Sequence, residues 1–309
     1  KVKIISVVYD LIPITHPQFC DAMFVTCFKD WFTELVKHAD GYISISQSVQ
    51  ADLQVFLRDT VGVVVPQGQF DYFWLGGDFD AKSGVHAVES AGKGLDDLSV
   101  RPALVESLAS NPSYLMVSTV EPRKNHQYLL DTFDLLWAQG ADVNLCIVGR
   151  MGWKVEALLR RIEQHPEKNV RLFWWSDLSD DELLYCYGNA KMLLFPSFIE
   201  GFGLPLVESL SNGLPVLASD TPIHREIGGE QIGYFDLADP HSLKEKLLAI
   251  EASGIPDSLQ VSPGYQWLSW LESSRMLLNK MNGIASLDLC ESECEQSNVA
   301  RSLLGVVPD

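Results

Sequence analysis

Hydrophobic positions over residues 113–250 come in short, nearly continuous runs, separated by polar stretches that repeat with helical spacing. Apolar runs of this length between amphipathic stretches are typical of buried strands that alternate with helices. The predicted strands are 114–119, 143–149, 170–175, 191–197 and 214–219. Because such strands need helices on both faces, we predict a parallel α/β sheet in a Rossmann-like domain.

The sequence also marks where several helices begin. Asn125 is expected to cap the helix 126–139, and Ser179 with Glu182 forms an S-x-x-E capping box at the start of another. The first of these helices has one apolar stripe, formed by Tyr128, Leu129, Phe133 and Leu136. The stripe predicts the face that packs on the sheet.

Residues 1–75 repeat the pattern in shorter form, with strands expected at 3–10, 41–46 and 61–68. A helix over 22–38 is expected between the first two strands, and Ser46 is placed to cap the next helix. The first helix is expected to bury Phe24, Phe28, Trp31 and Leu35. Residues 76–110 are expected to be loop and linker, and a further amphipathic helix is expected over 265–281.

These elements predict two α/β units that face each other across a cleft at the carboxyl ends of their strands, where open sheets usually bind ligands. The predicted parts are a partial amino-terminal domain with its linker (1–108), a carboxyl-terminal domain (109–262), a helix packing back toward the first domain (263–282) and an acidic tail (283–309).

Composition narrows the possible functions. The 309 residues have a net charge of −18, which disfavours binding to the phosphate backbone of nucleic acids. No apolar run approaches the roughly 20 residues that a membrane-spanning helix needs. Six cysteines without a C-x-x-C pair favour reduced thiols and a cytoplasmic protein. No cluster of His, Asp or Glu has the spacing of a metal site, so no metal is predicted.

The segment 196–219 contains the first candidate site. Pro205 suits the first turn of a helix from about Leu204 to Ser211, and a helix amino terminus that follows a glycine turn can bind anions. Glu200 precedes that turn and Glu208 lies about one turn inside the helix. The free N–H groups of the turn belong to Gly201, Phe202 and Gly203.

Carboxylates beside such a turn suit a ligand that has both phosphates and hydroxyl groups. The alternative is a helix-start acid with a second, solvated acid. The second candidate is the stretch 118–127, where Arg123 and Lys124 follow a strand end and could meet a diphosphate. A solvated cationic pair is the alternative there. His16 is either a cleft residue or a packed loop histidine.

Several motifs in order resemble one family. The stretches "VSTVEPRKNHQYLLDTF", "CIVGRMGW", "LSDDELLYCYGNAKMLLFPSFIEGFGLPLVESLSNGLPVLASD" and "EIGGEQIGYFD" resemble the carboxyl-terminal domain of retaining GT-B glycosyltransferases of family 4. The mannosyltransferase-like branch of bacterial polysaccharide synthesis is most similar. Glu200 and Glu208 match the E-x7-E motif of that family. Residues 1–75 resemble the second half of its amino-terminal domain, and about 70 to 90 residues are expected to be absent before Lys1.

The resemblance implies a role for each candidate. Glu208 would bind the ribose hydroxyls of the donor, Glu200 would contact the donor sugar, and Lys124 helped by Arg123 would stabilise the diphosphate leaving group. Thr119, Leu204 and the turn Gly201, Phe202 and Gly203 would also lie on the donor side. Asp10 and His16 would lie on the acceptor side. Ser118-Thr119 replaces the Gly-Arg common in the family, so one phosphate cation is missing.

The implied reaction moves a hexose from a nucleotide sugar, GDP-mannose being expected, to a glycan or a lipid-linked glycan with retention at the anomeric carbon. No cofactor is implied. The implied location is the cytoplasm, with peripheral association at the inner face of the membrane or in a synthase complex. Two alternatives stay open. One is a non-catalytic module that binds a sugar nucleotide or a partner enzyme, and the other is a sugar-nucleotide epimerase on the same scaffold.

Overall fold

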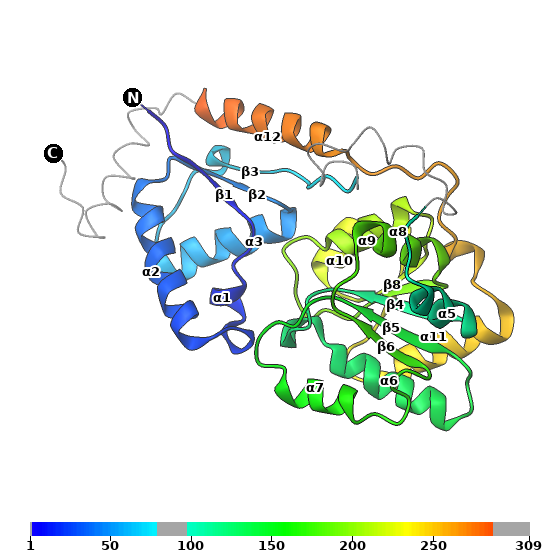
Figure 1. The fold of residues 1–309 in the computed structure, drawn as a ribbon. Helices are drawn as coiled ribbons and strands as arrows, with labels where there is room; N and C mark the ends of the chain where they lie inside the picture. The colour runs from blue at the N-terminus through cyan, green and yellow to red at the C-terminus, as the bar shows by residue number, and fades with distance from the viewer. Residues whose placement is uncertain (1, 79–97, 287–309) are drawn as a thin grey trace. The chain divides into compact units, whose positions relative to one another are not determined.

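The computed structural model describes residues 2–78 and 98–286, and their contacts divide the chain into two compact units. The first unit extends to Gly76 and also includes Glu200–Phe202 and the segment from Leu268 onward. The second unit consists of Gly77–Ile199 and Gly203–Trp267. Figure 1 shows the elements of each unit.

The second unit is built on a parallel sheet of six strands in the order β6-β5-β4-β7-β8-β9. Its strands are β4 (Ser113–Val117), β5 (Asn144–Val148), β6 (Leu172–Trp175), β7 (Met192–Phe195), β8 (Val216–Ser219) and β9 (Gly233–Phe235). All residues of β5, β7 and β8 are buried, as their continuous apolar sequences require. The predicted fold class, α/β with parallel sheets, is therefore observed.

Helices cover both faces of this sheet (Figure 1). They are α5 (Pro102–Ser110), α6 (His126–Ala138), α7 (Glu156–Glu163), α8 (Asp180–Asn189), α9 (Leu204–Ser211), α10 (Pro222–Gly228) and α11 (Pro240–Ser253). On one face α6 packs against α11, and the expected stripe of α6 joins the core there. On the other face α9 lies against β7 and β8.

In the second unit, two of the three predicted helix starts are found as expected. Both bonds of the Ser179–Glu182 capping box are present, and α9 has the predicted limits with Pro205 in its first turn. Asn125 occupies the cap position of α6 at φ 59° but makes no side-chain cap bond, so that detail of the prediction is wrong. Its left-handed backbone ends the preceding turn, and Asn tolerates that conformation better than most residues.

The first unit has a parallel sheet in the order β1-β2-β3, with β1 (Ile5–Val8), β2 (Gly41–Ser44) and β3 (Phe70–Tyr72). Its helices are α1 (Ile12–Thr15), α2 (Ala22–His38), α3 (Gln47–Phe56) and α12 (Trp270–Ala285). Ser46 caps α3 through the N–H of Val49, as expected. The last helix lies along the strands, where Lys280 pairs with Asp71 at 2.8 Å.

The buried face of α2 differs from the predicted one. Phe24 and Trp31 are 52% and 56% exposed, whereas Phe32 and Val36 are buried. The helix has two overlapping apolar stripes, and packing selects between them because the Phe32 ring meets the Phe56 ring of α3 edge-on at 5.6 Å. Local spacing alone could not make this choice.

Three boundaries also differ from the predictions. No strand forms over 61–68, since Pro66 has no N–H for a ladder, and β3 begins only at Phe70. Residues 102–110 form α5 rather than linker. The last helix begins at Trp270 and not at 265, because Ser269 and Glu272 form a capping box there, and it continues into the first residues of the predicted tail. Residues 79–97 of the linker and 287–309 of the tail lie outside the described residues.

Candidate functional site

The two candidate segments of the second unit follow neighbouring strands. The turn 118–125 follows β4 and the loop 196–203 follows β7, and these strands pair in parallel with Leu115 opposite Leu193. Parallel neighbours end at the same edge of a sheet, which is where open α/β sheets bind ligands. The sheet order therefore brings the two segments together at the carboxyl edge of its central strands.

Lys124 ends a single 3₁₀ turn, Pro122–Lys124, and is buried at this edge. Its Nζ atom lies 5.7 Å from the centroid of the Phe195 ring at the end of β7. A cation at that distance is attracted by the negative face of the ring. The contact holds the ammonium group beside the strand that leads into the loop 196–203.

Arg123, the residue before it, links the turn to the loop. Its guanidinium pairs with the Glu121 carboxylate at 2.7 Å, and its Nη1 donates to the carbonyl of Ile199 at 3.2 Å. The N–H of Phe198 donates to the carbonyl of Arg123 at 2.8 Å. A backbone hydrogen bond and a side-chain hydrogen bond thus join the two segments.

Glu208 is buried in the second turn of α9, where it accepts a hydrogen bond from the hydroxyl group of Tyr187 at 2.9 Å. Tyr187 belongs to α8 and is itself buried. Burial, together with the neighbouring Glu208 carboxylate, raises the pKa of Tyr187 well above its usual value, so the hydroxyl group stays a donor. Tyr187 was not predicted as a site residue, because its hydrogen bond to Glu208 joins two helices that are distant in the sequence.

The glycine turn before α9 is divided between the units: Glu200, Gly201 and Phe202 belong to the first and Gly203 to the second. Glu200 is buried. Gly203 has φ 98°, a left-handed conformation that favours glycine, and a Cβ there would lie 3.3 Å from the Phe195 ring. Leu204 then begins α9, so the first N–H groups of that helix follow the turn directly.

Ser118, which begins the turn 118–125, and His126, which follows it, are both buried. His126 Nε2 is 3.3 Å from Ser118 Oγ, and burial, helped by the charge of Lys124, lowers the pKa of His126 to about 3. The imidazole is therefore neutral near pH 7. Thr119, the next residue, is exposed. At the adjacent strand end, Gly149 has φ 154° and a Cβ there would meet the carbonyl oxygen of Ser118 at 1.8 Å.

The two acceptor-side candidates lie in the first unit. The Asp10 carboxylate follows β1 and accepts a hydrogen bond from the N–H of Ile12 at 3.0 Å. His16 is half-buried, stacks on the Phe19 ring and has its Nδ1 atom 2.9 Å from the hydroxyl oxygen of Thr15. Both side chains thus have local partners within the segment that follows β1.

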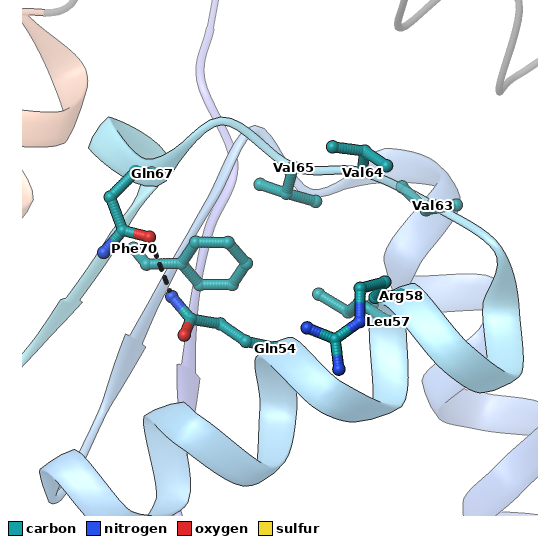
Figure 2. Close-up of a pocket in the computed structure, with 8 residues that line it drawn as sticks. All are labelled: Gln54, Leu57, Arg58, Val63, Val64, Val65, Gln67 and Phe70. Atoms are coloured by element: carbon teal, nitrogen blue, oxygen red, sulfur yellow. Dashed lines mark hydrogen bonds between the residues drawn. The ribbon is translucent and has the colours of Figure 1, made fainter.

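A hollow in the first unit contains none of the predicted site residues (Figure 2). It lies between α3 with its following turn and the segment that leads to β3. Its lining is Gln54, Leu57, Arg58, Val63, Val64, Val65, Gln67 and Phe70. The amides of Gln54 and Gln67 bond to each other at 3.1 Å, so its polar groups are partly satisfied already.

Across residues 2–78 and 98–286, no group of three or more His, Cys, Asp or Glu side chains could hold a metal ion. None of the helices in these ranges combines the length and the hydropathy needed to cross a bilayer.

The model of the family "Glycosyl transferases group 1" matches residues 106–260, which is half of the chain. The match includes the turn with Lys124, the loop after β7 and all of α9. The chain belongs to this family.

Several proteins of similar sequence are named as mannosyltransferases. The serotype-specific mannosyltransferase WbdA of Escherichia coli is 35% identical over 285 residues, which are 90% of this chain and 33% of WbdA. The O-antigen chain mannosyltransferase B of Escherichia coli is 34% identical over 118 residues, which are 38% of this chain and 30% of that protein. The chain spans about a third of the length of these relatives.

Solved structures are similar in fold. The Anabaena protein HepE, crystallised in complex with UDP and glucose, has a TM-score of 0.64 at 14% identity, over 92% of this chain and 72% of HepE. TarM has a TM-score of 0.55 at 13% identity, over 97% of this chain and 50% of TarM. These similarities confirm the predicted GT-B fold class.

Proposed function

We propose that this chain is the donor-binding part, with an acceptor-facing unit, of a retaining hexosyltransferase of family 4. The reaction is transfer of mannose from GDP-mannose to a glycan or lipid-linked glycan during polysaccharide synthesis. One observation supports the proposal most: the turn with Lys124 and the loop that leads to Glu200 are bonded to each other where two central parallel strands end. Ligands of such sheets bind at this edge.

The chemistry of the donor explains the residue types. Departure of a nucleoside diphosphate builds up negative charge, which the Lys124 ammonium group and the first N–H groups of α9 would stabilise. Glu208 would accept hydrogen bonds from the ribose hydroxyl groups, with Tyr187 holding its carboxylate. Glu200, beside Gly201 and Phe202, would contact the donor sugar. Neither a metal nor a cofactor is part of the proposal.

The names of the relatives support mannose as the sugar and O-antigen-like polysaccharide as the product. Asp10 and His16 of the first unit are proposed to face the acceptor. The cytoplasm is the proposed location, at the inner face of the membrane when the acceptor is lipid-linked.

Calorimetric titration of the chain with GDP, UDP and ADP tests the donor site. We expect micromolar binding of GDP in preference to the others, and a loss of at least tenfold in affinity in Glu208→Ala, corresponding to about 1.4 kcal/mol. The exposed Glu230→Ala is the matched control and should bind like the wild type. If Glu208→Ala and Glu230→Ala weakened GDP binding equally, or if the wild type bound none of the nucleotides, the proposed donor site would be contradicted.

Transfer of mannose from GDP-mannose to a mannose-containing oligosaccharide tests the reaction. Glu200→Ala should abolish transfer while GDP binding survives. Full transfer by that variant would show that the site is wrongly assigned. Nucleotide binding by the wild type without transfer would favour the non-catalytic module, and isomerisation of the donor sugar without an acceptor would favour the epimerase.

A further inference from the structure

We propose that Arg123 is a positioning residue, which fixes the loop that leads to Glu200 against the turn with Lys124, and that Glu121 holds Arg123 in place. The resemblance to the family implied that Arg123 helps to bind the diphosphate. The contacts of its guanidinium group point to a different task. This inference rests on the proposed function, since positioning affects catalysis only where a reaction takes place.

Arg123 directly precedes Lys124 in the chain, and its Nη1 donates to the carbonyl of Ile199, which directly precedes Glu200. One side chain therefore connects the neighbours of both proposed catalytic residues. The backbone bond from Phe198 to the Arg123 carbonyl supports the same connection one residue earlier.

The partner of Arg123 explains why its guanidinium group stays there. Glu121 is buried, with only 2% of its side chain exposed, and a buried carboxylate needs a charged or hydrogen-bonding partner. The planar guanidinium group presents several donors in a fixed fork, so one side can meet the Glu121 carboxylate while another donor reaches the Ile199 carbonyl.

This pairing also weakens Arg123 as a phosphate ligand. A carboxylate 2.7 Å from the guanidinium group offsets most of its field at a ligand further away. The donors directed at Glu121 and Ile199 could serve a diphosphate only if they left these partners, and leaving the buried Glu121 carboxylate is costly. The pair of Arg123 and Glu121 instead fixes the position of the loop that leads to Glu200. Misplacing catalytic groups by about 1 Å can cost on the order of 100-fold in rate.

The decisive experiment compares Arg123→Met, Glu121→Gln and the double variant. If the pair positions the loop, each single change should lower kcat by about 10- to 100-fold. The dissociation constant of GDP should stay within about twofold, and the double variant should be no worse than the worse single one, because both remove the same interaction. Arg160→Met, an exposed arginine on α7, is the matched control and should retain full activity.

A phosphate ligand would give the opposite pattern. Arg123→Met would then weaken GDP binding by tenfold or more, while Glu121→Gln would release the guanidinium group and leave GDP binding equal or tighter. That pattern overturns the proposal, and so does a kcat unchanged in both single variants.

Hydrogen exchange separates this inference from the proposed function. In both single variants the amides of 197–200 should exchange faster than in the wild type, because the bond from Arg123 to the Ile199 carbonyl is lost in Arg123→Met and weakened in Glu121→Gln. Exchange unchanged in this segment would overturn the positioning role even if the protein transferred no sugar. If the wild type transferred no sugar but both variants exchanged faster than it did, the positioning role of Arg123 would stand and only the proposed reaction would be overturned.

Discussion

At the residue scale, the contact between Tyr187 and Glu208 shows how a buried hydroxyl group can prepare a carboxylate for a ligand. One oxygen of Glu208 accepts from Tyr187 at 2.9 Å, and this bond limits the orientations that the carboxylate can take. Hydrogen bonds to charged groups are worth roughly 1.5–3 kcal/mol, more than neutral ones. A preoriented carboxylate loses less freedom when it binds ribose hydroxyl groups.

We therefore expect Tyr187→Phe to weaken GDP binding by about 5- to 20-fold, since it removes this bond and leaves the ring in place. The value of kcat at saturating donor should change little, because Glu208 would contact the nucleotide and not the reacting sugar. Calorimetry and steady-state kinetics measure the two effects. Tyr185→Phe on the same helix is the control, and an equal loss there would contradict the specific role of Tyr187.

At the scale of elements, the close approach of β4 and β5 at the carboxyl edge depends on a glycine. The backbone of Gly149 comes so near Ser118 that a Cβ would overlap the Ser118 carbonyl oxygen at 1.8 Å, and the indole N–H of Trp174 bonds to the Gly149 carbonyl at 2.9 Å. Gly140, after α6, also has a positive φ of 80°, but a Cβ there would meet nothing within 4 Å.

This difference predicts the outcome of two matched substitutions. Gly140→Ala should cost only the backbone strain, about 1 kcal/mol in the free energy of unfolding. Gly149→Ala should cost several times more, since it adds a clash between two strand ends to that strain. Urea unfolding measures both values, and equal costs would show that the strand ends can separate freely.

At the scale of the whole molecule, the free energy of unfolding should decrease at low pH, because two groups of the second unit have a lower pKa in the folded chain than in the unfolded chain. Burial lowers the pKa of His126 to about 3, and the hydrogen bond from Arg101, the first of several causes, lowers the pKa of Glu182 to about 2. In both cases the unfolded chain takes up the proton at a higher pH than the folded chain does. The stability each group contributes is present above its unfolded pKa and is lost as the pH falls toward its folded pKa.

As the pH falls, the contribution of His126 is lost first, because the pKa of histidine in the unfolded chain is near 6.5. We expect the free energy of unfolding to decrease by about 1.4 kcal/mol per pH unit as the pH falls from about 6 toward 4, and Glu182 to add to the decrease below about 4.5. His126→Phe removes the first contribution, so its stability should be flatter between pH 6.5 and 4.5. Chemical denaturation across this pH range measures the free energy of unfolding. If its slope against pH were the same in the variant as in the wild type, the assignment to His126 would be contradicted.

Much of the second unit could be predicted from the sequence because its signals are local. The strand runs, the stripe of α6, the Ser179–Glu182 capping box and the limits of α9 each depend on residues within one or two turns of each other. The candidate residues Lys124, Glu200 and Glu208 could be named for the same reason, since motifs at the ends of strands and the starts of helices are continuous in the chain.

Only the tertiary structure decided matters that depend on contacts between distant segments. It chose the buried face of α2 through Phe56, paired Arg123 with Glu121 and the Ile199 carbonyl, and placed the Tyr187 hydroxyl group on Glu208. The physical reason is the same in each case: a side chain with several acceptable local environments takes the one in which a distant partner satisfies its charge, its hydrogen bond or its apolar surface. The sequence by itself determined most elements of the second unit and which residue types meet at the carboxyl edge of β4 and β7, because these depend on local patterns. Packing determined which of these residues hold the others in place.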